Sequence, residues 1–440
     1  MSQRDPQPGF SSLDRAWALR LSGDREGALR LAASVLAKEP AELGAAALLC
    51  RCLLDADRAE RAGETCQVLV RRHIARGDLP GACYAANLAL EAGGYAPSAL
   101  FDIANAFGKG STRVSAGATR PPPLPVETDV APHFAQQRGP RLLAAAEMAL
   151  AHFAGTRPAV ADDAQVPKLP LFAELAPPVL QRFLGSLAVR ELPAGAHLAR
   201  EGEAGQEAFV LVRGLLNVVR TDESAVLAAL GPGAIFGEMA LVSDAPRTAS
   251  VVAVEPVVVL SISRAHLEAL SHKDPAIGRE LGTFCHRRMV SNLILHSPIL
   301  SAIAPEQRQR MVRRFETRAF KPGERLVKAG QPSQGLWLLA SGGVEVRGRD
   351  RDGDTVMLAS LGPGQVVGEI SLVLRRPANA DVVAVHPTVA LCLSEANFHE
   401  AIREHPDLLR QLYELALHRE QETRSAVAQR AVDVSDLVLL

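Results

Sequence analysis

The 440-residue sequence lacks the features that would direct it to a membrane, a secretory route or a nucleic acid. No apolar run approaches the roughly 20 residues that a membrane-spanning helix needs, and the N-terminus lacks the apolar stretch of a signal peptide. Lys and Arg (48) balance Asp and Glu (49), so the charge favours neither DNA, RNA nor an anionic lipid surface. These absences predict a cytoplasmic protein with no membrane and no nucleic acid as partner.

Paired cysteines and catalytic motifs are also missing. The six cysteines form no C-x-x-C pair, and the one close pair, Cys50 and Cys52, could be a redox or metal site or two reduced side chains on a helix. We expect the reduced pair, with no metal and no cofactor. There is no G-x-S-x-G elbow, kinase loop, G-x-x-x-x-G-K loop or paired-His motif, so we expect no enzyme and assign no catalytic residue.

Residues 1–107 are rich in Ala and Leu without strand-like alternation, which predicts helices. Two segments, Gly23–Leu29 and Gly77–Cys83, each place a Gly-Asp turn before a Gly-Ala step. Asp24 and Asp78 are positioned to cap the helices that follow, and the Gly-Ala steps would let helices approach closely. The pattern resembles a degenerate tetratricopeptide repeat, which would offer a surface to an unidentified protein partner; a plain helical bundle is the alternative.

Residues 108–168 differ in composition from the helical region before them. They carry Gly-Ser-Thr and a cluster of prolines, which is typical of extended linkers. We therefore expect a Pro- and Gly-rich linker here, interrupted by one short helix near Arg141–Phe153.

The rest of the chain contains an internal repeat. A Leu-Gly-Pro-Gly motif at Leu230 recurs 131 residues later at Leu361, and the glycines preceding it recur after 128 residues. These glycines are Gly195, Gly202 and Gly214, then Gly323, Gly330 and Gly342. Short apolar runs between glycines indicate antiparallel rolls. We predict an α+β multidomain protein: the helical repeat-like region, then two antiparallel, jelly-roll-like β-rolls with flanking helices, at residues 169–297 and 298–440.

The most informative segment is FGEMALVSDAPRTASV, residues 236–251. Gly237 permits close backbone approach, and one helical turn beginning at Glu238 would direct N–H groups toward an anion. Arg247 can grip two phosphate oxygens at once, and an ionised Glu238 can accept hydrogen bonds from sugar hydroxyls. The combination fits a phosphate joined to a ribose.

This segment resembles the phosphate-binding cassette of the cyclic-nucleotide-binding domain family. That family includes regulatory subunits of cAMP-dependent protein kinase, gating domains of ion channels and the catabolite activator protein. The resemblance implies that Glu238 binds the ribose 2′-hydroxyl and Arg247 the cyclic phosphate; an internal pair between them is the alternative. The other residues predicted to bind the ligand are Gly237, Met239, Ala240, Thr248, Ala249 and Ser250. Thr248 leaves cAMP and cGMP both open, with cAMP favoured, and Ser250 is also compatible with a purely structural strand position.

The second copy of the segment, residues 367–382, aligns without a gap. Ala378 stands at the arginine position, and Asp381 stands at the position of Ser250. A cyclic phosphate would lose its main charge partner, at a cost of about 2 to 5 kcal/mol, and would meet an added carboxylate. We therefore predict a degenerate second site. Its residues are Gly368, Glu369, Ala378 and Asp381.

Helices are expected after the first roll, near His266–Leu270 and again from Asp274. In the family, the helix after the roll carries an apolar cap over its base. Leu281, Phe284 and Met289 are candidates for that cap, with plain packing between domains as the alternative.

Three other interpretations compete with a single-site receptor. Arg375 or Arg376 could rescue the second site by bending inward. Both rolls could have lost the ligand and serve as an interaction scaffold, although the intact Glu238 and Arg247 argue against this. A transcription factor would need a helix-turn-helix, but only one helical stretch, Ala401–Gln429, follows the second roll.

Overall fold

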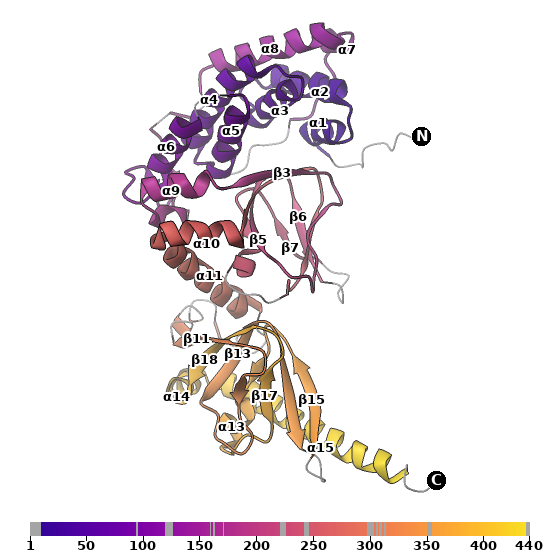
Figure 1. The fold of residues 1–440 in the computed structure, drawn as a ribbon, viewed down its shortest axis with the longest axis vertical. Helices are drawn as coiled ribbons and strands as arrows, with labels where there is room; N and C mark the ends of the chain where they lie inside the picture. Colours follow the sequence, from indigo (N-terminus) through magenta and orange to yellow (C-terminus); the bar gives the residue numbers. More distant parts are fainter. Residues whose placement is uncertain are drawn as a thin grey trace. The chain divides into compact units, whose positions relative to one another are not determined.

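A computed structural model describes residues 10–436 except 94–95, 119–125, 159, 162, 170, 221–225, 242–245, 297–302, 305–306, 308–309, 312–313 and 350–353 (Figure 1). The chain divides into two compact units. The first comprises Met1–Glu201, Gln206–Leu241 and Ala249–Gly282, and the second comprises Gly202–Gly205, Val242–Thr248 and Thr283–Leu440. Each unit is considered by itself below.

The first unit begins with an array of helices in which consecutive members pack against one another. They are α1 (Ser12–Leu21), α2 (Arg25–Lys38), α3 (Leu43–Leu54), α4 (Ala59–Arg76), α5 (Leu79–Glu91) and α6 (Ala96–Phe107). Their shared interior is built from small and branched side chains, with Leu48, Leu49 and Leu69 fully buried. The prediction of an all-helical N-terminal region is confirmed.

The two Gly-Asp turns cap helices as the sequence predicted. Asp24 accepts a hydrogen bond from the N–H of Gly27 at 2.8 Å, and Asp78 accepts one from Gly81 at 3.0 Å. The glycines also have a role that we did not expect, beside the close approach of helices. A Cβ at either glycine would lie 2.3 Å from the capping carboxylate, and at Gly81 also 2.3 Å from the ring of His73. Each glycine therefore makes room for its own cap, and Gly81 also allows the neighbouring helix α4 to approach closely.

The helices and strands that the structure describes between residues 108 and 168 pack on the array, which differs from the extended linker that the composition suggested. They form β1 (Val114–Ser115), α7 (Pro132–Ala135), α8 (Gly139–Gly155) and β2 (Val166–Pro167), with β1 and β2 paired in parallel. Helix α8 packs on α2, α3 and α4. The side chains it buries completely are Leu142, Ala146, Leu150 and Phe153. Arg72 of α4 fixes its end by donating to the carbonyls of Phe153 (2.9 Å) and Thr156 (2.6 Å). An apolar stripe at helical spacing thus outweighs the local Pro and Gly content.

Each β-roll consists of two four-stranded antiparallel sheets with the same strand order. In the first roll the sheets are β3-β10-β5-β8 and β4-β9-β6-β7, and in the second they are β11-β18-β13-β16 and β12-β17-β14-β15. The first roll's strands are β3 (Ala188–Leu192), β4 (His197–Ala199), β5 (Glu207–Arg213), β6 (Leu216–Val219), β7 (Val226–Leu230), β8 (Ile235–Phe236), β9 (Ser250–Ala253) and β10 (Val257–Ser263). The second roll's strands are β11 (Phe315–Phe320), β12 (Arg325–Val327), β13 (Gly335–Ser341), β14 (Val344–Arg349), β15 (Thr355–Leu361), β16 (Val366–Val367), β17 (Asp381–Ala384) and β18 (Thr388–Ser394). The predicted fold class is confirmed.

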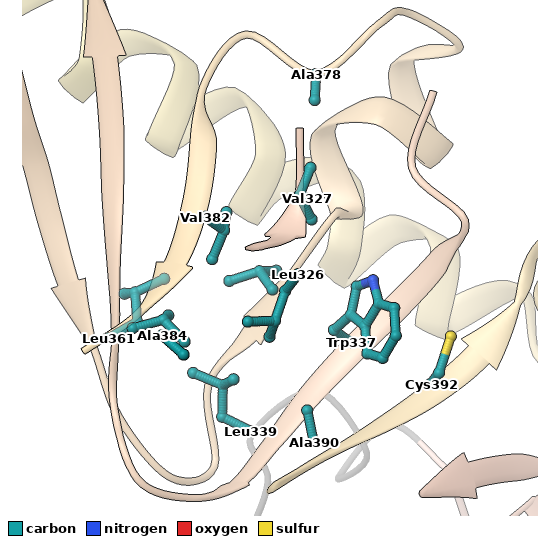
Figure 2. Packing of buried hydrophobic residues seen from close by; sticks show 12 residues of the cluster. Leu326, Val327, Trp337, Leu339, Leu361, Ala378, Val382, Ala384, Ala390 and Cys392 are labelled. Carbon is teal, nitrogen blue, oxygen red and sulfur yellow. The ribbon is translucent and has the colours of Figure 1, made fainter. Parts of the chain in front are cut away.

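Each roll encloses an apolar core between its two sheets. In the first roll, Phe209 and Val259 from one sheet meet Leu216 and Val251 from the other. In the second roll, Trp337 occupies the position of Phe209. Figure 2 shows it among side chains of both sheets. The other members of this cluster that the figure labels include Leu326, Leu339, Val382 and Ala390.

Helices flank both rolls. Those of the first are η1 (Phe172–Glu174), α9 (Pro177–Leu184), η2 (Glu238–Leu241), α10 (Arg264–Lys273) and α11 (Pro275–His296). Those of the second are α13 (Glu369–Leu374), α14 (Glu395–Glu404) and α15 (Pro406–Asp436). Helices α10 and α11 confirm the two that the sequence predicted after the first roll. Leu281, Phe284 and Met289 of α11 are all buried, and their role as a cap stays a prediction.

Buried charges attach the helical array to the first roll. Glu191 of β3 accepts hydrogen bonds from Arg20 at 2.5 Å and from the hydroxyl of Tyr84 at 2.8 Å. Arg213, at the end of β5, pairs with Asp14 of α1 and donates to the carbonyl of Pro256 at 2.6 Å. Burial lowers the pKa of Arg213, and the pairing with Asp14 opposes this shift. These contacts make the array and the first roll one packed unit.

Candidate functional site

The first cassette begins where β8 ends. Gly237 adopts φ 72°, in the left-handed region that favours glycine, and this directs the chain into the 3-10 turn η2. Glu238 starts that turn and is only 5% exposed. The predicted helical turn at Glu238–Leu241 is confirmed. Met239 is half-buried and Ala240 is buried.

A guanidinium that the sequence analysis missed anchors this turn. Arg264, the first residue of α10, donates from Nε to the carbonyl oxygen of Ala240 at 2.8 Å, and its Nη2 donates to the same oxygen. The helix after the roll is therefore tied directly to the cassette. No local motif marks Arg264, because its acceptor is a backbone carbonyl 24 residues earlier.

The backbone of the arginine position is held by two hydrogen bonds. The carbonyl oxygen of Arg247 accepts a hydrogen bond from the N–H of Gly202 at 2.9 Å. The backbone N–H of Arg247 donates a hydrogen bond to the carbonyl oxygen of Glu203, also at 2.9 Å. Ala204 and Pro246 form a bridge beside them. Thr248 is exposed and Ala249 is half-buried.

The second roll reproduces this backbone at its own arginine position. The carbonyl of Ala378 accepts from Gly330 at 2.8 Å, and its N–H donates to Gln331 at 2.9 Å. The side chain has only a methyl group, is 8% exposed and belongs to the apolar core. In Figure 2 it points toward Val327, at the upper end of that core. The two rolls thus hold this position with the same backbone hydrogen bonds, but one carries a guanidinium and the other a methyl group.

Ser250 and Asp381 also perform the same structural task. The hydroxyl oxygen of Ser250 accepts from the N–H of Glu201 at 3.0 Å, and a carboxylate oxygen of Asp381 accepts from Ala329 at 2.8 Å. The other carboxylate oxygen of Asp381 lies 3.6 Å from Arg325. Our inference that Asp381 brings an added charge toward a phosphate therefore needs correction, since its carboxylate already binds the N–H of Ala329 and lies near Arg325 of β12.

The glutamate of the second cassette already has a cationic partner. Glu369 is 2% exposed, and Arg419 of α15 donates to it at 2.8 Å and to the carbonyl of Val366 at 2.6 Å. Gly368 before it adopts φ 87°, in the same left-handed region as Gly237 of the first roll. The rescue of this site by nearby arginines finds no support: Arg376 is exposed and pairs with Glu420 at 3.4 Å, and Arg375 is also exposed.

Sequence comparison places both rolls in one family. Residues 189–274 and 317–405 match the family described as cyclic nucleotide-binding domain. The two rolls are cyclic nucleotide-binding domains. Residues 19–73 match a tetratricopeptide repeat family, so the helical array contains a tetratricopeptide-like repeat. Both resemblances that the sequence suggested are confirmed.

Among curated proteins, the chain is 27% identical to the type II regulatory subunit of cAMP-dependent protein kinase from Drosophila melanogaster over 232 residues, 53% of this chain and 59% of that one. A regulatory subunit from Yarrowia lipolytica is 27% identical, over 49% of this chain and 54% of its own length. Of these two subunits, the chain thus spans between half and three-fifths. A cyclic nucleotide-gated potassium channel of Mesorhizobium japonicum is 41% identical over 112 residues, 26% of this chain and 30% of the channel.

Among solved structures, the regulatory domain of Toxoplasma gondii PKA with cAMP is 23% identical, covers 56% of this chain and 92% of that domain, and aligns with a TM-score of 0.28. In the part of the chain that the structure describes, no helix has the length and apolar character to cross a membrane. Within the same residues, no group of three or more His, Cys, Asp or Glu side chains is arranged to hold a metal ion.

Proposed function

We propose that this protein is a cyclic-nucleotide receptor with one working site, in the first domain. The observation that carries the proposal is the matched pair at the arginine position. Arg247 and Ala378 have the same backbone hydrogen bonds, but only Arg247 can neutralise a phosphate. Regulatory subunits of cAMP-dependent protein kinase are among the relatives, which supports a regulatory role.

In the proposed complex, Arg247 binds the cyclic phosphate through paired N–H groups. The buried carboxylate of Glu238 accepts a hydrogen bond from the ribose 2′-hydroxyl. Backbone N–H groups of Gly237 and Ala249 assist, and Met239, Ala240, Thr248 and Ser250 complete the surroundings. We favour cAMP over cGMP because several relatives carry cAMP in their names.

The proposed signal leaves through α10. Arg264 joins α10 to the turn that carries Glu238, so a ligand that tightens this turn would favour one placement of the helix. Such a coupling is typically worth about 1 to 3 kcal/mol. The receiver is a protein partner that binds the helical array. In this proposal the protein catalyses no reaction itself. We place it in the cytoplasm, where cysteines stay reduced, in keeping with its six free cysteines.

Isothermal titration of the full chain with cAMP and with cGMP tests the proposal. We expect about one nucleotide per chain, because Ala378 cannot replace a guanidinium. Arg247→Ala should weaken binding by about 1.5 to 3.5 powers of ten. Arg376→Ala is the matched control, since this exposed arginine precedes Ala378 in the second cassette, and it should leave the affinity unchanged. A chain that binds neither nucleotide would instead be an interaction scaffold.

A further inference from the structure

The C-terminal helix supplies a charge to the pocket of the second domain. Arg419 of α15 lies against Glu369, with side-chain exposures of 18% and 3%. The same nitrogen of Arg419 also donates to the carbonyl of Val366, the residue that begins β16. Both acceptors belong to the second cassette or to the strand leading into it, and neither carries a hydrogen to donate.

The position of Arg419 on α15 follows from the helical repeat. Leu408, Leu412 and Ala416 are fully or almost fully buried at four-residue intervals. Arg419 comes three residues after Ala416, so it lies on the same face. Helix α15 packs on α13, which begins with Glu369. The apolar face therefore positions the helix on the domain, and Arg419, one turn beyond Ala416, reaches the buried carboxylate of Glu369.

We propose that the second domain is closed by its own C-terminal helix, with Arg419 as an internal substitute for a ligand. A ribose entering this pocket would have to displace a guanidinium from Glu369, and its phosphate would then meet the methyl group of Ala378. Removing one partner of a buried ion pair is strongly destabilising, because the other charge stays buried. Helix α15 therefore stays docked whether or not a nucleotide is present.

Hydrogen–deuterium exchange on the full chain tests this latch. In Arg419→Gln, amides of α15 between Leu408 and Arg419 should exchange about tenfold faster or more, because the local opening of the helix becomes easier. Arg376→Gln is the matched control: it removes the exposed pair with Glu420 on the same helix and should change exchange little. In the wild-type chain, addition of cAMP should leave exchange in α15 unchanged.

A second variant separates the latch from general stability. Glu369→Gln should raise exchange in the same segment, and combining it with Arg419→Gln should add less than the sum of the two single effects. If β13 and β18 also lose protection in Arg419→Gln, the Arg419→Lys variant, which keeps the positive charge, decides between the two explanations. Restored protection of α15 in Arg419→Lys supports the latch, and unrestored protection overturns it.

Unchanged exchange of α15 in Arg419→Gln would overturn the proposal, as would opening of α15 in the wild type on addition of nucleotide. The variant comparison needs no nucleotide. Failure of the receptor proposal would appear in the isothermal titration of the wild type and Arg247→Ala with nucleotide. Failure of the latch would appear only in the hydrogen exchange of α15.

Discussion

The two domains share a backbone and differ in the side chains placed on it. Their sheets have the same strand order, and the arginine position is held by equivalent hydrogen bonds in both. The cations that reach the two cassettes come from different helices. Arg264 of α10 binds a carbonyl of the first turn, whereas Arg419 of α15 binds the glutamate of the second. The comparison teaches that the roll specifies the cassette backbone, and the proposed function makes the capacity to bind a phosphate depend on one side chain placed on it.

Ser250 and Asp381 show that two different residues can fill the same structural role. Both accept a hydrogen bond from a backbone N–H two residues beyond the paired strand, that of Glu201 at 3.0 Å and that of Ala329 at 2.8 Å. A hydroxyl and a carboxylate are both acceptors, so either satisfies this N–H. The loss of function predicted for the second cassette therefore depends on Ala378 and on the Arg419 latch, and no longer on Asp381.

The largest expected difference concerns the attachment of the first roll to the helical array. Arg213→Ala leaves Asp14 buried without its guanidinium and should lower the free energy of unfolding of the first unit by about 3 to 5 kcal/mol. Ser341 occupies the corresponding strand position of the second roll, and Ser341→Ala should cost about 1 kcal/mol or less. Urea unfolding followed by Trp17 in the first unit and Trp337 in the second, using single-tryptophan variants, measures both. Equal losses of unfolding free energy in Arg213→Ala and Ser341→Ala would contradict the claim that Arg213 attaches the roll to the array.

The next effect concerns the anchor of the first cassette. Arg264→Ala removes a hydrogen bond from a charged group to the carbonyl of Ala240 and should destabilise the turn by about 1.5 to 3 kcal/mol. Hydrogen exchange of residues 236–241 reports this directly. Glu395 stands at the corresponding position in the second roll and has no N–H group to donate from its side chain. Glu395→Ala should leave exchange in α13 unchanged, and a similar rise in both domains would argue against a specific anchor.

A smaller effect is expected at the shared strand contact. Ser250→Ala removes the acceptor for Glu201 N–H and should cost about 1 kcal/mol of stability. Asp381→Asn keeps an acceptor oxygen and should cost less. Thermal unfolding of the two variants and the wild type compares them, and a larger loss in Asp381→Asn would show that its charge, rather than the hydrogen bond, matters.

The smallest effect is a difference in acid sensitivity. Burial tends to raise the pKa of Asp55, but hydrogen bonds from Arg20 and Arg51 outweigh it and hold the pKa below its usual value. A lowered folded-state pKa gives stability that is present above the unfolded value, about 3.8, and is lost as the pH falls through the folded value. The first unit should therefore weaken below about pH 4. Unfolding from pH 5 to 2.5 should show a shallower loss for Asp55→Asn, and an unchanged slope would exclude this carboxyl as the cause.

Much of this architecture could be predicted from the sequence because its signals are local. Repeated glycines mark the rolls, the cassette marks the site, and Asp24 and Asp78 mark helix starts. The attachments could not be predicted. Arg213 meets Asp14 across 199 positions, and Arg419 meets Glu369 across 50, so no local pattern connects them. The packing of α8 on the array could not be predicted for another reason, because the prolines around this helix are typical of a linker.

A crystal structure of the full chain grown with excess cAMP tests the central claim most directly. The account predicts one nucleotide per chain, with its cyclic phosphate bound by the guanidinium of Arg247 and with Arg419 still paired to Glu369. A nucleotide bound only beside Ala378, with Arg419 displaced, would contradict it.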